Sequence, residues 1–393
     1  MNRRKFIRNT AFAAVGSSFA GPLLSGVARA DGRPLKVAVM ANMSGPAAFF
    51  GQACKNCASL AISDINARGG VLGRRLELLV GDAGAAPADA AQSALRLWKG
   101  EGAEVFVGSH DSAVRNALES VFRGKVPYFY TPTYEGSDCA LGTFYLGETP
   151  KQQIAPAIPF LAQEHKLKRW YFVGNGYVWP RKSNAVARTV VQSSGGTIVG
   201  EEYVPFTVDN FDSTLVKIRD SGADAVFITL VGGSAVTFNR AFASFGLSNK
   251  VLRFGTMLED NTIAGIGAQG TGNLYYSSGF ISSGKTPTTV AFMNRYHSAF
   301  GNTSILSGVG ESVFEGFMMF DAIAAKAKSL DVTALANASE GATFNGPRGK
   351  ITMKGRNVTA DMYLAKANGT TYDIVKTFPQ LESGEVCPLD RSK

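Results

Sequence analysis

The sequence predicts an α/β fold of two lobes, each built on a parallel sheet with helices packed against it. Short apolar runs rich in β-branched and aromatic residues alternate with segments whose apolar residues recur every three or four positions. This alternation is typical of βαβ units in parallel sheets. It occurs twice, with a crossing expected near residues 147–153, and a chain of 393 residues exceeds what one core usually organises.

The expected elements follow one another in chain order along both lobes. The predicted strands lie at residues 35–40, 76–80, 105–108, 126–130, 170–173, 225–231 and 274–277. The predicted helices lie between them at residues 52–66, 87–99, 184–193 and 236–245.

Residues 1–30 have the form of an export signal. Basic residues precede the apolar run 11–27, which is too short for a stable membrane anchor, and Ala-Arg-Ala at 28–30 is a small-x-small cleavage site. We therefore predict cleavage after Ala30 and a periplasmic mature protein. Asn-Arg-Arg-Lys-Phe-Ile at 2–7 resembles a twin-arginine signal, which exports folded proteins; an ordinary secretory signal is the alternative.

Charge and hydropathy exclude two classes of partner. The formal net charge of +9 includes five basic residues of the signal and no acid, which leaves +4 on the remainder. Basic residues are scattered, so neither nucleic acid nor an anionic membrane surface is expected as a partner. Because no later stretch holds 18 apolar residues, the mature chain is not expected to insert into a membrane.

Candidate ligand groups follow the predicted third strand. Ligands of open parallel sheets bind beyond the carboxyl ends of the strands. His110, Asp111 and Ser112 stand there at the start of a predicted helix, whose free N–H groups suit a carbonyl or carboxylate oxygen. Ser112 is the first candidate for a ligand hydrogen bond. The alternative is that Asp111 or Ser112 only caps the helix.

Aromatic residues gather at two further strand ends. Tyr130, Pro132, Thr133 and Tyr134 belong to a loop dense in hydroxyl groups and rings. Tyrosines there can cover a ligand and donate a hydrogen bond to it, or they can pack between the lobes. Tyr177 and Trp179 follow the first predicted strand of the second lobe. The two sets together predict a cleft that closes on a small polar molecule.

Several motifs, in this order, resemble a known family. They are Ser-Asp-Ile-Asn-Ala-Arg-Gly-Gly-Val-Leu-Gly at 63–73, the strand into Gly108, Tyr-Glu-Gly at 134–136, Pro-Lys-Gln-Gln at 150–153 and Trp-Pro-Arg-Lys-Ser-Asn at 179–184. The chain resembles type I periplasmic solute-binding proteins over residues 35–378. The most similar branch includes urea- and short-chain-amide-binding proteins and the amide sensors of amidase operons.

The resemblance implies two Rossmann-like lobes joined by a three-strand hinge. The N-terminal lobe is expected at 31–152 plus about 282–350, and the C-terminal lobe at 153–281 plus about 351–393. The implied function is capture of urea, a short-chain amide or an amino acid by hinge closure. Delivery would be to an inner-membrane ABC permease with its ATPase. No cofactor and no metal are expected.

The resemblance also assigns positions. Ser112, the loop from Tyr130 to Tyr134, and the pair Tyr177 and Trp179 match ligand-side residues of the family. Val231 and Gly232 match a loop of the second lobe, and Glu259 stands where amino-acid-binding relatives keep an acid for the ligand ammonium. His110, Pro132 and Trp179 depart from the amide-binding pattern, where an aromatic, a threonine and a tyrosine are usual. The solute can therefore differ from urea or acetamide.

Enzymatic functions find little support in the motifs. The chain has three histidines and no Gly-x-Ser-x-Gly or His-Glu-x-x-His motif. Residues 265–270 match Gly-x-Gly-x-x-Gly but precede a strand, which indicates a loop. His110 beside Asp111 lacks an evident nucleophile partner. We therefore predict a binding protein and not an enzyme, with a sensor of the same fold or a periplasmic amide hydrolase as alternatives.

The four cysteines divide into two pairs. Cys54 and Cys57 lie one turn apart in the first predicted helix, where they either stay reduced or form a local disulfide. Cys139 and Cys387 can pair, because the periplasm permits disulfides. Sequence spacing leaves these alternatives open.

Overall fold

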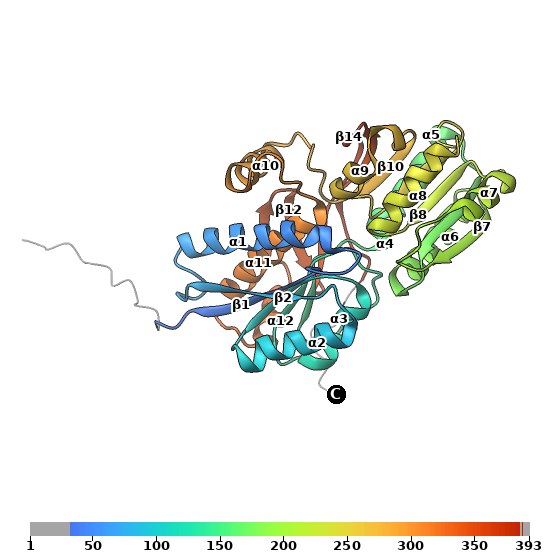
Figure 1. The fold of residues 1–393 in the computed structure, drawn as a ribbon. Coiled ribbons are helices and arrows are strands. Elements are labelled where there is room, and N and C mark those ends of the chain that lie inside the picture. Colours follow the sequence, from blue (N-terminus) through green and yellow to red (C-terminus); the bar gives the residue numbers. More distant parts are fainter. Residues whose placement is uncertain (1–31, 386, 388–393) are drawn as a thin grey trace, which may run out of the picture.

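The computed structural model describes residues 32–385 and 387 (Figure 1). Its helices pack against two sheets, and one strand pairs with both sheets. The predicted signal, residues 1–30, lies outside the described residues. In the described part, no helix is long and apolar enough to cross a bilayer. The predicted α/β class is confirmed, with mostly parallel strands in both sheets.

The first lobe contains a parallel sheet in the order β2-β1-β3-β4-β5. Its strands are β1 (Leu35–Ala41), β2 (Leu76–Asp82), β3 (Val105–Ser109), β4 (Tyr128–Tyr130) and β5 (Thr143–Tyr145). Later segments add the antiparallel β11 (Thr343–Gly346) and β12 (Gly349–Lys354). The inner strands β1 and β3 are buried on both faces, as near-continuous apolar runs predict for a parallel sheet.

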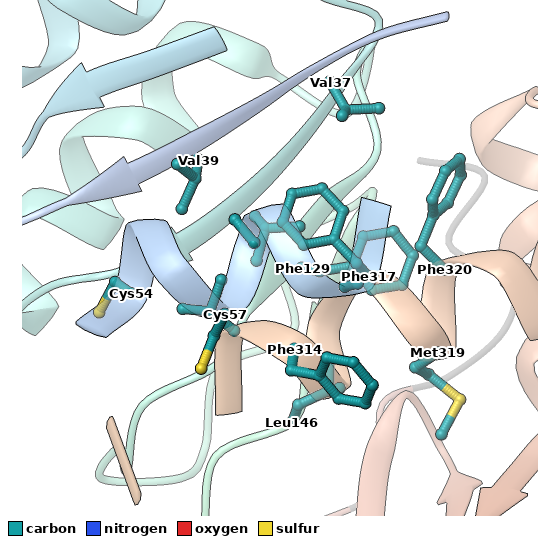
Figure 2. Packing of buried hydrophobic residues seen from close by; sticks show 14 of the residues in the cluster. Val37, Val39, Cys54, Cys57, Phe129, Leu146, Phe314, Phe317, Met319 and Phe320 are labelled. Atoms are coloured by element: carbon teal, nitrogen blue, oxygen red, sulfur yellow. The ribbon is translucent and has the colours of Figure 1, made fainter. Parts of the chain in front are cut away.

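Helices cover both faces of this sheet. Its helical segments are η1 (Ala48–Phe50), α1 (Gly51–Ala67), α2 (Pro87–Leu95), η2 (Arg96–Gly100), α3 (Ser112–Phe122), α10 (Pro287–Phe300), α11 (Gly308–Ala327) and α12 (Val332–Ser339). One core joins α1 and α11 to the strands, and a second joins α2 and α3 to the opposite face. Figure 2 shows Cys54 and Cys57 of α1 among the side chains of the first core. Both are buried free thiols.

The second lobe contains the sheet β7-β6-β8-β9-β10-β13-β14, which is parallel as far as β10. Its strands are β6 (Arg169–Asn175), β7 (Thr197–Val204), β8 (Ala225–Thr229), β9 (Leu252–Gly255), β10 (Leu274–Ser278), β13 (Asn357–Asn368) and β14 (Thr371–Leu381). Its helices are α4 (Pro150–Gln153), α5 (Ala157–His165), α6 (Val178–Ser193), α7 (Asp212–Ser221), α8 (Gly233–Ser244), α9 (Asp260–Ile266) and η3 (Ala268–Gly270). Two buried clusters lie on its opposite faces.

Strand β13 links the two sheets. Asn357 at its start pairs with Tyr145 of the first sheet, and its later residues pair with β10 and β14 of the second. The chain also crosses between the sheets after β5 and after β10. Glu148 of the former crossing accepts hydrogen bonds from Gly279 N of the latter (3.1 Å) and from the buried Arg348 (2.6 Å). These contacts hold the crossings together.

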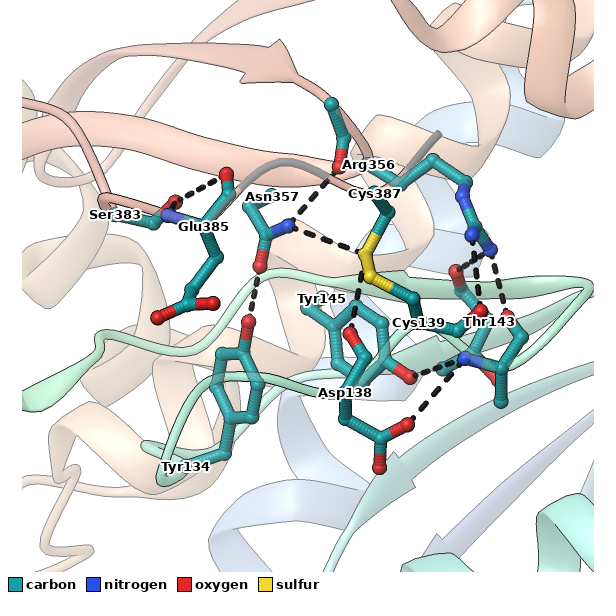
Figure 3. Close-up of a disulfide and its surroundings, with 12 residues drawn as sticks. Tyr134, Asp138, Cys139, Thr143, Tyr145, Arg356, Asn357, Ser383, Glu385 and Cys387 are labelled. Carbon is teal, nitrogen blue, oxygen red and sulfur yellow. Dashed lines mark hydrogen bonds between the residues drawn. A yellow bond between two sulfur atoms is a disulfide. The ribbon is translucent and has the colours of Figure 1, made fainter. Parts of the chain in front are cut away.

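The segment after β14 returns to the first lobe. Cys387 forms a disulfide with Cys139 at a sequence separation of 248 (Figure 3). Thr149 Oγ1 donates to Ser383 O at 2.8 Å, which places the returning segment beside the first crossing. The sequence assigned about 351–393 to the second lobe; β12 and this returning segment instead contact the first.

Candidate ligand-binding cleft

A cavity of about 290 Å³ lies where the loops of the first sheet face those of the second. Nine residues predicted from the sequence line it: His110, Asp111, Ser112, Tyr130, Pro132, Thr133, Tyr177, Trp179 and Val231. The carboxyl ends of strands from both sheets therefore supply the wall, as expected for open parallel sheets.

The start of α3 supplies three of these residues. Asp111 is the N-cap, and its Oδ1 accepts hydrogen bonds from Ala113 N at 2.8 Å and Val114 N at 3.0 Å. The capping interpretation of Asp111 is thus correct, and the residue also lines the cavity. Because the carboxylate uses these two N–H groups, they are not available to an anionic ligand.

His110 is a neutral ring fixed by its neighbours. Its Nδ1 lies 3.1 Å from Asp111 O and its Nε2 lies 2.8 Å from the Tyr128 hydroxyl. A carbonyl oxygen can only accept, so we assign the proton to Nδ1 and let Nε2 accept from Tyr128. Burial lowers the pKa of His110 to about 4. Tyr130 donates its hydroxyl hydrogen to His110 O at 2.6 Å, so these rings offer mainly apolar surface.

Ser112 is already engaged as a donor. Its Oγ donates to Glu135 Oε2 at 2.6 Å, and Arg115 Nη2 donates to Glu135 Oε1 at 2.7 Å. Arg115 also pairs with Asp138 at 2.9 Å. Both Ser112 and Glu135 are buried, so this arrangement satisfies a carboxylate that would otherwise be costly. The Ser112 hydroxyl can still accept a hydrogen bond from a ligand, but it has no second hydrogen to donate.

Thr133 is engaged as well. Its Oγ1 lies 2.8 Å from both Glu148 O and Gln153 Oε1. It therefore ties the Tyr130–Tyr134 loop to the first crossing.

The second lobe supplies the unpaired donors. Tyr177 is the N-cap residue of α6, and its ring lies 5.0 Å from that of Phe206 and 6.2 Å from that of Trp179. Burial raises the pKa of Tyr177 well above its usual value, and Asp111, Tyr130 and Glu135 of the other lobe raise it further. In the described part of the chain, the half-buried Tyr177 makes no side-chain hydrogen bond, and the buried Trp179 Nε1–H has no hydrogen-bond partner. A buried donor of this kind calls for an acceptor.

Comparison with known proteins identifies the family. The model of a family described as periplasmic binding protein matches residues 34–371. The chain belongs to the periplasmic binding protein family. The match confirms the predicted family, and the solved structures described next confirm its type I fold.

Curated relatives of this periplasmic binding protein include two homologues from Brucella. Leu/Ile/Val-binding protein homolog 4 of Brucella abortus is 24% identical, with 97% of this chain and 98% of the relative covered. Leu/Ile/Val-binding protein homolog 6 of Brucella melitensis is 23% identical over 67% of this chain, and that match spans 66% of the relative, just under two thirds.

Solved structures share the fold at low identity. A solute-binding protein of an ABC transporter from Rhodopseudomonas palustris, in complex with p-hydroxybenzoic acid, superposes with a TM-score of 0.83 at 20% identity, covering 90% of this chain and 99% of that one. A leucine-binding protein from Thermotoga maritima has a TM-score of 0.78 at 16% identity, covering 88% and 99%. These names do not single out the urea and amide branch.

Three predicted site residues of this periplasmic binding protein do not line the cavity. Tyr134 is fully buried, donates to Asn357 Oδ1 and stacks on Tyr145 at 4.9 Å (Figure 3). Glu259 accepts from the Tyr276 hydroxyl at 2.7 Å and from Val309 N at 3.4 Å. Burial raises the pKa of Glu259 to about 8. Gly232 faces the other lobe outside the cavity wall, against Pro46.

Other lining residues were absent from the predicted set. They are Asn42, Pro46, Ala47, Phe50, Gly84, Ala85, Ala86, Ser109, Phe206, Met257 and Val309. The residues around Asn42 and Phe50 follow the first strand, a position that itself marks a ligand loop. Val309 lies in the first turn of α11, which no local pattern connects to the cavity.

Proposed function

We propose that this protein is the periplasmic substrate-binding component of an ABC importer. It captures a small polar solute by closure of the two lobes and delivers it to an inner-membrane permease with its ATPase. The predicted signal, cleaved after Ala30, supports export. Ser112 donates to Glu135 and His110 pairs with Tyr128, so these residues do not form the nucleophile–base pair that an amide hydrolase requires.

The observation that carries the choice of solute is the division of hydrogen-bonding groups across the cleft. Trp179 of the second lobe presents a buried donor without a partner among the described residues. The half-buried Tyr177 beside it makes no side-chain hydrogen bond there, while Ser112 of the first lobe keeps only acceptor capacity. An amide offers a carbonyl oxygen for the former and an N–H for the latter. This complementarity favours a urea or short-chain amide.

Charge also favours a neutral solute. Among the described residues lining the cavity, none is Lys or Arg, and Asp111 is the one acid. A carboxylate ligand would enter a closed site without a cation to pair with, which is costly. The neutral His110 supplies no positive charge either.

An amino acid or aromatic acid is the second candidate. The named relatives include Leu/Ile/Val-binding homologues and a complex with p-hydroxybenzoic acid. Rings of Phe50, Tyr130, Tyr177, Trp179 and Phe206 line the cavity and suit an apolar or aromatic body. Asp111 is the lining acid that an ammonium group would approach.

A thermal-shift panel on the chain from Asp31 onward tests these alternatives. Urea, acetamide, propionamide, leucine, phenylalanine and benzoate are added in turn, because a ligand that binds only the folded state raises Tm by mass action. We expect a shift with the amides. A shift with leucine or benzoate alone would move the assignment to the second candidate, and release of ammonia from acetamide would contradict a purely binding role.

A further inference from the structure

Gly232 brings the second lobe into close contact with the first. A Cβ built on Gly232 would lie 2.9 Å from Pro46 O and 3.3 Å from the Phe49 ring. Pro46 belongs to the first lobe, and both Pro46 and Val231 line the cavity. The contact therefore lies at the edge of the cavity, between the lobes.

The first-lobe side of this contact is rigid. Asp82 Oδ1 accepts hydrogen bonds from Met43 N at 3.0 Å, Ser44 N at 3.2 Å and Gly84 N at 2.8 Å. A Cβ on Gly45 would lie 2.3 Å from Gly84 O, so this loop is packed closely against its neighbour. Pro46 O is a backbone atom that follows this network by two residues, and it cannot rotate away as a side chain would.

The second-lobe side is rigid as well. Asn175 Oδ1 accepts from Val231 N at 2.8 Å and from Ser234 Oγ at 3.1 Å, which fixes the loop before α8. Gly232 has φ 62° and ψ −134°, a conformation that favours glycine. A methyl group at position 232 would require one of these two loops to move by a few tenths of an ångström, and such a movement would strain the hydrogen bonds given above.

A second interlobe contact lies beside the first. Asn261, in the first turn of α9, donates from Nδ2 to Phe49 O at 3.2 Å. Asn261 and Gly232 thus contact the same short first-lobe segment, residues 46–49. One contact is steric and the other is a hydrogen bond.

We propose that Gly232 and Asn261 form an interlobe closure contact with Pro46 and Phe49, and that this contact sets how tightly the cleft closes on its solute. The inference rests on the proposed function, because it specifies how capture by closure is completed. Gly232 permits the approach of the lobes, and Asn261 stabilises the closed form. Both are positioning residues, since neither lines the cavity.

The test compares Gly232→Ala and Asn261→Ala with two matched controls. Gly233→Ala adds a methyl one residue later, where nothing lies within 4 Å. Asn249→Ala removes an exposed asparagine of the second lobe. Affinity is measured by calorimetry with the compounds of the thermal-shift panel. Closure is measured by electron-spin distances between nitroxides at Val290→Cys of the first lobe and Val216→Cys of the second, which are 43% and 38% exposed.

We expect the distance between the labels to shorten when the parent protein binds its solute. In Gly232→Ala, solute binding should shorten this distance less than in the parent. Kd should rise by about tenfold or more, because the added methyl disfavours the closed state. Asn261→Ala should raise Kd roughly two- to tenfold, as expected for one lost hydrogen bond. Both controls should behave like the parent.

Three results would overturn the proposal, and they are distinguishable. Equal closure and equal Kd in all variants would reject the contact while leaving the proposed function intact. A lower Tm of unliganded Gly232→Ala, with unchanged Kd and closure, would show that the glycine only relieves loop strain. A parent protein that neither binds nor closes with any compound of the panel would reject the proposed function and the contact together.

Discussion

At the scale of single residues, the cavity separates groups that the protein has already satisfied from groups that it has not. The Ser112 hydroxyl donates a hydrogen bond to Glu135, and the Tyr130 hydroxyl donates one to His110 O. Among the described residues, the buried Trp179 Nε1–H has no such partner, and the Tyr177 side chain makes no hydrogen bond. The two lobes are therefore expected to respond differently to loss of a hydroxyl.

Tyr177→Phe should weaken solute binding by about 1 to 3 kcal/mol, because an acceptor of the ligand is left unsatisfied in a closed site. Its unfolding free energy should stay near that of the parent. Ser112→Ala should weaken binding by a similar amount and also lower stability by roughly 1 kcal/mol, because the buried Glu135 loses one of its two donors and keeps only Arg115. Calorimetry and thermal unfolding of both variants, the latter without solute, measure the two effects. Normal binding in both would place the ligand elsewhere.

Glu259 should make stability fall as pH rises. Its pKa is raised by burial from 4.5 to about 8, so the folded protein holds this proton more tightly than the unfolded chain does. The stability that protonated Glu259 contributes to the folded state is fully present below about pH 4.5 and is lost as pH rises to about 8. Glu259→Gln cannot ionise, so it should gain up to a few kcal/mol over the parent at pH 8 relative to pH 5.

Thermal unfolding of the parent and of Glu259→Gln at both pH values, without solute, measures that difference. The exposed Glu101→Gln is the control and should show no such gain. Parallel pH profiles for the parent and Glu259→Gln would contradict the assignment.

Single residues were predictable from the sequence where a local pattern marked them. Ser112 and Asp111 stand at a helix start, and Trp179 follows a strand end, so their place at the cavity followed from chain order. Tyr134 was not predictable in this way, because its partner Asn357 lies 223 positions away. Glu259 was assigned by resemblance, and its burial behind Tyr276 depends on tertiary packing.

At the scale of elements, the N-cap of α3 connects helix stability to the cavity. Asp111→Ala should cost about 1 kcal/mol of stability, whereas Asp111→Asn should cost little because asparagine caps equally well. Asp331, whose Oδ1 caps α12 at Ala334 N, is the matched control away from the cavity. Asp331→Ala should cost a similar amount of stability in thermal unfolding and leave solute binding unchanged. An unchanged stability for Asp111→Ala would contradict the capping role.

The predicted bounds agreed best with the structure for elements that bury one face, and for strands that are buried along their whole length. The predicted strand at 35–40 is β1, Leu35–Ala41. Helix α6 begins at Val178, before the predicted 184, because a proline in the first turn is tolerated. Helix α11 was not predicted, since it is buried on nearly all sides and carries little helical periodicity.

At the scale of the whole molecule, the disulfide between Cys139 and Cys387 encloses the entire second lobe in a covalent loop. Loss of the bond should lower stability by about 2 to 5 kcal/mol, because the unfolded chain regains freedom. Dithiothreitol should therefore lower the Tm of the parent. The double variant Cys139→Ser, Cys387→Ser should start from the lower Tm and not respond to the reductant. A parent insensitive to reduction would contradict the pairing.

The two-lobe plan was predictable because βαβ alternation is a local signal that occurs twice. The path of the last part of the chain was not. Strand β13 contributes to both sheets, and the choice between them depends on pairing with Tyr145 and β10, which lie far away in the sequence. The return of residues 382–385 and Cys387 to the first lobe carries no local pattern at all.

The disulfide also bears on the order of biogenesis. Cys387 follows the whole second lobe in the sequence, so the ribosome must complete both lobes before the two sulfurs can meet. The bacterial cytosol keeps thiols reduced. Export by the predicted twin-arginine signal would carry the protein across the membrane folded, with Cys139 and Cys387 still reduced. The disulfide would then form only in the periplasm. The covalent ring would then be a chemical mark of successful export, present in the delivered protein and absent from the copy still waiting inside.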